Sequence, residues 1–170
     1  MEEEFVAFAT ARSGPLYRSA HFLTGGDAHL AEDLVQETLG QMYAQWHRLY
    51  RPGWAGRIDN AAGYAQTVLV RAFLTHQRRR SSGERPSQVL PEVSAHERDA
   101  ALRMALLGAL AQLPPRDRAV VVLRYWEDRS VQETAVILKD SSSAVRTRCT
   151  RALARLRSLL GADLAELVAP

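Results

Sequence analysis

Arginines are interleaved with small hydroxyl side chains over residues 142–157, the stretch of this chain with the clearest chemical capacity. Five arginines stand there beside Ser142, Ser143 and Thr147, with no acidic residue between residues 141 and 160. Guanidinium groups bind phosphate oxygens and the edge of guanine, and short hydroxyl side chains can approach bases and phosphates closely. A helix face that is only solvated usually carries glutamate as well. The composition therefore predicts binding to nucleic acid.

Two helices joined by a tight polar turn are predicted to position these residues. Ser130 and Glu133 form a capping box at the start of a short helix, and Ser141 caps a longer one. The longer helix carries an apolar stripe at helical spacing, made of Val145, Cys149, Ala152, Leu153, Leu156, Leu159 and Leu160. This is the outline of a helix-turn-helix, whose second helix enters the major groove. A helical hairpin with a solvated arginine face shares the outline, so the motif alone leaves both interpretations open.

No catalytic, metal-binding or cofactor-binding pattern accompanies the basic helix. The five histidines are scattered without ligand spacing, and no glycine-rich phosphate loop or strand pattern is present. The single cysteine, Cys149, falls on the apolar stripe, which favours a small core residue over a redox switch. We therefore expect a binding protein without enzyme activity, cofactor, metal or small-molecule substrate.

Charge is distributed unevenly along the 170 residues, although the net charge is only +3. Residues 1–50 hold seven acids and three arginines, residues 51–90 hold seven arginines and two acids, and residues 114–160 hold ten basic residues and five acids. Basic segments attract phosphate backbones, whereas an acidic segment suits a protein partner. No apolar run approaches the roughly 20 residues that span a bilayer. The acidic N-terminus lacks the pattern of a signal peptide, so we expect a cytoplasmic protein.

The first half of the chain is predicted to hold three helices and one loop. A helix over residues 5–22 is expected to break or kink near Gly14 and Pro15. Asp27 is predicted to cap the next helix, over residues 28–49. This helix has a clean apolar stripe, formed by Ala31, Leu34, Val35, Thr38, Leu39, Met42, Tyr43 and Trp46. Residues 50–60 form a loop, and Asn60 caps a helix over residues 61–80 whose end is basic. The simpler interpretation of that end, without DNA binding, is that the positive charges of residues 78–80 interact favourably with the dipole of their own helix.

The second half begins with a linker rich in Ser, Gly and Pro and continues with helices. Helices are expected over residues 96–112 and 116–126, the latter packing Trp126 inside, and Gly161 is expected to end the last helix. The predicted fold is all-α: two small helical domains joined by a flexible linker, the second a helix-turn-helix. The expected boundaries are, in order, domain 1–80, linker 81–96, domain 97–161 and tail 162–170.

Four motifs in this order resemble the bacterial RNA polymerase sigma factors of the sigma-70 family. They are AEDLVQETLGQMYAQW (31–46), LTHQRRR (74–80), LPPRDRAVVVLRYWED (113–128) and VRTRCTRALARLR (145–157). The resemblance covers about residues 5–160 and is strongest to the extracytoplasmic-function (ECF) subgroup and its SigE-like actinobacterial branch. It implies binding to core RNA polymerase, through the β′ clamp helices and the β flap, and to promoter DNA. Such factors are commonly held inactive by an anti-sigma factor, a partner that this sequence does not identify.

The resemblance assigns roles to residues of this chain. Docking on the β′ clamp helices falls on Asp33, Leu34, Gln36 and Glu37. Capture of a flipped base and grip on the −10 element fall on Trp54, Ile58, Asp59, Asn60, Arg71, His76, Arg78 and Arg79. At the −35 element, Ser142, Ser143, Arg146 and Thr147 would lie nearest the bases, with Arg148 and Arg151 on phosphates.

The implied function is a promoter-specificity subunit that recognises the −35 and −10 elements, helps open the promoter and initiates transcription. The alternative is a helix-turn-helix regulator that acts without replacing a sigma subunit; an adaptor that binds no DNA is a third reading. The chain departs from the family pattern at the turn, with Lys139 where glycine is usual and Asp140 where an apolar residue is usual. A left-handed lysine costs about 1 kcal/mol, so an altered turn or an unusual −35 grip is expected.

Overall fold

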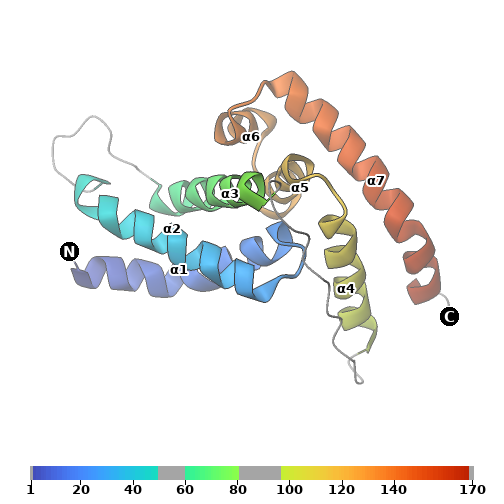
Figure 1. Cartoon of the computed structure of the whole chain (residues 1–170), viewed down its shortest axis with the longest axis horizontal. Helices are drawn as coiled ribbons and strands as arrows, with labels where there is room; N and C mark the ends of the chain where they lie inside the picture. The colour runs from blue at the N-terminus through green and yellow to red at the C-terminus, as the bar shows by residue number, and fades with distance from the viewer. Residues whose placement is uncertain (1, 50–59, 81–96, 169–170) are drawn as a thin grey trace. The chain divides into compact units, whose positions relative to one another are not determined.

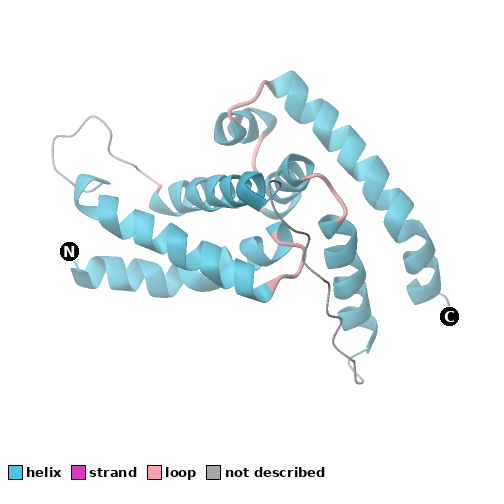
Figure 2. Ribbon diagram, in the orientation of Figure 1, coloured by secondary structure: helices cyan, strands magenta, loops and turns pink. Residues whose placement is uncertain are grey.

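The described part of the chain consists of helices connected by short turns. The computed structural model describes residues 2–49, 60–80 and 97–168, which form seven α-helices and one π-helix with no strand among them (Figure 1, Figure 2). The expected all-α fold is confirmed. Two compact units are present, Met1–Phe73 and Leu74–Pro170. The expected linker, residues 81–96, lies outside the described residues.

Three helices start in the first unit. Helices α1 (Glu2–Leu23) and α2 (Ala28–Leu49) lie side by side and run in opposite directions, and α3 (Ala61–Arg80) follows (Figure 1). Asp27 and Asn60 each precede a helix and accept a hydrogen bond from the backbone N–H three residues ahead, at 3.0 and 2.8 Å. A polar side chain at this position satisfies an N–H that has no partner inside the helix. The two predicted caps are confirmed.

The core of the first unit is the apolar stripe of α2 covered by α1 and α3. Its buried side chains include Leu16, Leu23, Ala31, Leu34, Thr38, Met42, Trp46, Leu69 and Phe73. The predicted burial of Tyr43 in this stripe is wrong, because Tyr43 is 50 % exposed. Tyr43 lies at the edge of the stripe, where its ring contacts that of Phe5 with 5.0 Å between centroids. A polar link joins α2 to α3, since the Tyr64 hydroxyl donates to Gln45 Oε1 at 3.0 Å.

Helix α1 continues through Pro15, so of the break or kink expected there the break is wrong. Proline removes one backbone donor and one helical hydrogen bond. Packing compensates for this loss, because Leu16, Ala20 and Leu23 on the following turns are all buried.

The second unit is built around its last helix. Helix α7 (Ser142–Val168) packs against α4 (Glu97–Ala111), α5 (Pro115–Val121) and α6 (Val131–Leu138) (Figure 1). The predicted stripe of α7 holds in outline, with Val145, Ala152 and Leu156 buried and Cys149 half-buried. Gly161 does not end α7, contrary to expectation. One helical glycine costs only about 1 kcal/mol, which a long packed helix tolerates.

Helix α5 passes directly into a π-helix, η1 (Val122–Trp126). The wider turn is marked by the hydrogen bond from Glu127 N to Val122 O at 2.9 Å. A π turn rotates the residues that follow it out of the α-helical register. Trp126 is therefore 49 % exposed rather than packed inside, which corrects the sequence prediction. No helix among the described residues is both long and apolar enough to cross a membrane.

The junction of α4 and α5 depends on a buried arginine. Pro114 and Pro115 stand between the two helices, and α5 begins at Pro115. The Arg118 guanidinium donates to Ala111 O at 2.9 Å and to Leu113 O at 3.1 Å, and so satisfies carbonyls that the end of α4 leaves unpaired. Burial lowers the pKa of Arg118 to about 10, which still leaves it charged at neutral pH.

We expect Arg118→Met to destabilise the second unit by about 2–3 kcal/mol, because it keeps the apolar stem but leaves two buried carbonyls unsatisfied. Urea unfolding followed by circular dichroism measures this change. Arg103→Met on the exposed face of α4 is the matched control and should change stability by no more than about 0.5 kcal/mol. Equal effects of the two substitutions would contradict the role given to Arg118.

Candidate nucleic-acid interface

The helix-turn-helix expected from the sequence is formed by α6, the turn at residues 139–141 and α7. Ser130 Oγ accepts from Glu133 N at 3.0 Å, and Glu133 Oε2 accepts from Ser130 N at 2.7 Å, which is the predicted capping box. Ser141 Oγ accepts from Ala144 N at 3.0 Å and so begins α7. Both caps are local consequences of the sequence, because each joins residues only three positions apart.

Lys139 closes α6 in the left-handed conformation, with φ 51° and ψ 52°. The backbone geometry therefore follows the form that glycine usually provides, even though a lysine stands there. Its N–H donates to Val136 O at 3.3 Å, and the next N–H donates to Ala135 O at 2.9 Å. These bonds satisfy the last carbonyls of α6 and hold the strained residue in place.

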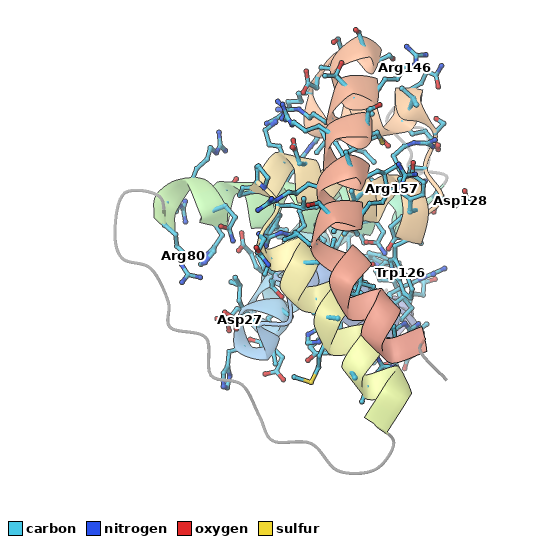
Figure 3. The ribbon with its side chains drawn as sticks, turned by 90° about the vertical axis from the view of Figure 1, so that its right-hand side faces the viewer. Asp27, Arg80, Trp126, Asp128, Arg146 and Arg157 are labelled. Carbon is cyan, nitrogen blue, oxygen red and sulfur yellow. The ribbon has the colours of Figure 1, made fainter. Side chains whose placement is uncertain are left out.

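The outer face at the start of α7 presents the side chains assigned to base contacts. Ser143, Arg146 and Thr147 are exposed and Ser142 is half-buried. Figure 3 shows Arg146 near the first turns of α7, with Arg157 further along the same helix. Within the described residues, no hydrogen bond or ion pair engages the guanidinium of Arg146. Its five N–H donors are available to an acceptor outside the chain.

Arg148 and Arg151, assigned to phosphates, are instead bound to an acid of α5. Arg148 Nη1 donates to Asp117 Oδ1 at 3.0 Å, and Arg151 donates to both oxygens of Asp117, from Nε at 2.9 Å and from Nη2 at 2.8 Å. Asp117 is only 1 % exposed. Burial raises its pKa, but the hydrogen bonds and charges of the two arginines outweigh burial, so the pKa lies below the ordinary 3.8. The carboxylate contributes stability above pH 3.8, and this contribution is lost as the pH falls through the lowered pKa.

The second unusual residue of the turn, Asp140, extends this cluster. Its Oδ1 accepts from Ser141 N at 3.0 Å, and its Oδ2 lies 3.3 Å from Arg148 Nε and 3.6 Å from Arg116 Nη2. The backbone N–H of Ser141 lowers the pKa of Asp140, and Arg148 adds to that effect. This acid ties the turn to α5 through Arg116 and to α7 through Arg148. We name Arg116, Asp117, Asp140, Arg148 and Arg151 the arginine–aspartate cluster.

The basic end of α3 carries the described part of the expected −10 site. Arg71, Arg78 and Arg79 are exposed and His76 is half-buried. Arg78 Nη2 donates to Thr75 Oγ1 at 3.2 Å. Asn60 is exposed and uses its side-chain oxygen as the cap of α3. Trp54, Ile58 and Asp59 lie outside the described residues.

The acidic face of α2 carries the expected polymerase contact. Asp33, Gln36 and Glu37 are exposed, and Gln41 Nε2 donates to Glu37 Oε1 at 3.0 Å. The assignment of Leu34 to the polymerase contact is corrected, because Leu34 is 1 % exposed and belongs to the core. A leucine at helical spacing among buried neighbours faces inward, so its side chain supports this face rather than forming it.

Two features of the second unit escaped the sequence analysis. Asp117 binds Arg148 and Arg151, which lie 31 and 34 positions further along the chain. Only the packing of α5 on α7 brings these residues together. The exposure of Tyr125 and Trp126 results from the π-helix, and no sequence pattern predicts that helix. Among the described residues, no group of His, Cys, Asp and Glu is arranged to hold a metal ion.

Comparison with known proteins accounts for this arrangement. A family model described as "Sigma-70, region 4" matches residues 103–156, which contain the helix-turn-helix. The chain is similar to the RNA polymerase sigma-E factor of Streptomyces coelicolor, with 36% identity over 167 residues that cover 95% of this chain and 89% of the relative. The sigma-E factor of Streptomyces avermitilis is 35% identical over 161 residues, which cover 92% of this chain and 85% of the relative.

Solved structures share the fold. The sigma factor RpoE of Bartonella quintana, crystallised with the anti-sigma factor NepR, has a TM-score of 0.70 at 23% identity and covers 95% of this chain and 99% of that one. CnrH, solved with the cytosolic domain of CnrY, has a TM-score of 0.63 at 23% identity and covers 96% and 91%.

The chain therefore belongs to the RNA polymerase sigma factors of the sigma-70 family. Within that family it is an extracytoplasmic-function sigma factor of the SigE-like branch.

We expect Lys139→Gly to stabilise the second unit relative to Lys139→Ala by about 1 kcal/mol, because glycine adopts a positive φ without the clash of a Cβ atom. Thermal unfolding of the two variants measures the difference, and alanine is the control for loss of the lysine charge. Equal midpoints would contradict the left-handed conformation of residue 139.

Proposed function

We propose that this chain confers promoter specificity on core RNA polymerase: it recognises the −35 and −10 elements, helps open the promoter and initiates transcription. It supplies no catalytic group of its own and acts in the cytoplasm, where bacterial DNA is transcribed. The observation that carries the proposal is the start of α7, where Ser143, Arg146 and Thr147 are exposed while Arg148 and Arg151 on the inner side of the helix are bound to α5. A rigid helix with free donors on its outer face can read a major groove.

The second DNA contact is proposed for the basic end of α3 and the loop before it. Opening a promoter requires that a base leaves the stack, which costs a few kcal/mol and is offset by a fitted pocket. Arg71, His76, Arg78 and Arg79 would hold the adjacent backbone, since arginine and lysine contacts to phosphate supply most sequence-independent affinity. Base capture is assigned to Trp54, Ile58, Asp59 and Asn60, as the family resemblance implies. Asn60 has a second task, because its side chain also caps α3.

The polymerase contact is proposed for Asp33, Gln36 and Glu37, whose side chains share the exposed side of α2. An acidic face would repel DNA and attract a basic surface on a protein. The clamp helices of β′ are the proposed partner of this face, and the β flap that of the second unit. Two weak DNA-binding units gain affinity once the polymerase fixes their separation.

An anti-sigma protein is proposed as a further partner. RpoE and CnrH were each solved with a partner, and the partner of RpoE is described as an anti-sigma factor. The other candidate, a helix-turn-helix regulator that leaves the sigma subunit in place, is not favoured. Relatives that span nearly the whole chain are sigma factors, and a regulator that reads only duplex DNA has no use for an acidic polymerase-binding face.

Run-off transcription is the direct test of the proposed function. Core polymerase from a Streptomyces species would be combined with the purified chain and a pool of templates with randomised upstream sequences. We expect transcripts that start at sites which core polymerase alone ignores, with shared upstream sequences among the selected templates. Transcription no different from that of core polymerase alone would refute the proposed function.

We expect the double substitution Asp33→Arg with Glu37→Arg to abolish co-elution with core polymerase, because it reverses the charge of the exposed side of α2. Circular dichroism should be unchanged, since both side chains are exposed. The matched control is Glu2→Arg with Glu3→Arg, which makes the same charge change on two exposed residues of α1. Co-elution of the α2 variant at the level of this control would remove the polymerase assignment.

We expect Arg146→Ala to reduce discrimination for the −35 sequence by about 1–3 kcal/mol, because it removes a donor pair aimed at base edges. Competition binding of the holoenzyme to selected and scrambled −35 templates measures the loss. Arg157→Ala, on the same helix but further along (Figure 3), is the matched control and should leave discrimination unchanged. An equal loss on both templates would identify Arg146 as a phosphate contact only.

A further inference from the structure

The arginine–aspartate cluster divides the arginines of α7 into two groups. Arg146, Arg155 and Arg157 are exposed and make no side-chain hydrogen bond or ion pair among the described residues. Arg148 and Arg151 are bound to Asp117 through three hydrogen bonds between 2.8 and 3.0 Å, and Arg148 also reaches Asp140. Bidentate pairing with a carboxylate is the geometry that holds a guanidinium most firmly.

The position of the two bound arginines on α7 determines what this contact fixes. At about 100° per residue, Arg148 borders the buried stripe of Val145 and Ala152, and Arg151 lies between Arg148 and the outer face that carries Thr147. Asp117 therefore binds α7 on one flank. The apolar stripe alone cannot fix the rotation of α7 about its axis, because apolar contacts are non-directional. Charged hydrogen bonds on a flank resist rotation of the helix about its axis.

The pairing of charges in the cluster opposes a phosphate role for these arginines, because two carboxylates offset two of the three positive charges. Three guanidinium groups and two carboxylates leave a net charge of +1, and the two carboxylates occupy donors of Arg148 and Arg151 that a phosphate would need. A buried aspartate without a positive partner would repel a nearby phosphate. An aspartate whose charge is neutralised by arginines would not. The cluster thus has the properties of an internal support.

We propose that Asp117, through Arg148 and Arg151, is a positioning residue that sets the rotation of the recognition helix and thereby −35 specificity. On this account the two arginines are not phosphate contacts. The inference rests on the proposed function, and it replaces the phosphate role that the family resemblance assigned to Arg148 and Arg151. It names Asp117, on a different helix from the base contacts, as a determinant of promoter discrimination.

The first test uses Arg151→Gln, which breaks the bidentate contact at a side chain that is 58 % exposed and leaves Arg148 on Asp117. Binding of the reconstituted holoenzyme is measured on a selected promoter and on the same promoter with a scrambled −35 element, over a range of KCl concentrations. We expect discrimination between the templates to fall by about tenfold, equivalent to about 1.4 kcal/mol, with no change in the slope of log affinity against log salt.

A phosphate contact would behave differently, because each lost contact lowers the magnitude of that slope by about 0.9. A slope reduced by about one would therefore overturn the proposal, and so would unchanged discrimination. Arg155→Gln removes the same charge from an exposed arginine one turn away and leaves the cluster intact. It should keep wild-type discrimination, and a tenfold loss in this control as well would also overturn the proposal.

A second test removes the acid. Asp117→Asn releases both arginines, so we expect affinity for the scrambled template to rise, with a salt slope steeper by about one to two. The triple variant Asp117→Asn, Arg148→Gln, Arg151→Gln should lose that gain. If Asp117→Asn weakens binding to both templates equally, Asp117 acts only on stability and the proposal is wrong. A variant that does not fold leaves the decision to Arg151→Gln, whose substituted residue is exposed.

Failure of the proposed function would be distinguished before any variant is measured. If the wild-type holoenzyme selects no upstream sequence, the chain is not a promoter-specificity subunit and the role of Asp117 falls with it. If the wild type selects a promoter and Arg151→Gln behaves as wild type, only the role of Asp117 is refuted.

Discussion

The second unit depends on the neutralisation of one buried carboxylate by two arginines from another helix. Asp117 is almost fully buried, and an unpaired carboxylate in such a site would be strongly unfavourable. The arginines that neutralise it come from α7, so the helix cannot move away from α5 without exposing that charge. The same interaction that makes burial of Asp117 possible therefore orients the surface that we propose reads DNA. Asp140 repeats the arrangement on a smaller scale at the turn.

The first unit has a different task, the presentation of the acidic face of α2 on an apolar core. Its core is mostly apolar and is formed by α1, α2 and α3, with polar links between Gln45 and Tyr64 and between Ser19 and Gln66. Because the core side of α2 is filled by residues such as Leu34 and Met42, its acids are held on the outside. The unit thus presents an outer face suited to a basic protein surface.

Sequence reasoning predicted the features that arise from contacts between near neighbours. The capping box of Ser130 and Glu133, the caps at Asp27, Asn60 and Ser141, and the apolar stripes all follow from residues within one or two turns of each other. It failed where distant contacts or backbone irregularities decide. Pro15 does not break α1 because tertiary packing holds the turns after it. Trp126 is exposed because a π turn changes the register, and Asp117 meets Arg151 only once α5 and α7 have packed.

Helix α6 is only eight residues long, and non-glycine residues with φ 51° stand on both sides of it, Asp128 before it and Lys139 after it. Each reverses the chain direction at a set place, and the caps at Ser130 and Ser141 follow within two residues. A single inserted or deleted residue between them would move at least one left-handed position onto a residue that must be helical. In evolutionary terms we expect this segment to tolerate exchange of its exposed side chains more readily than a change of length.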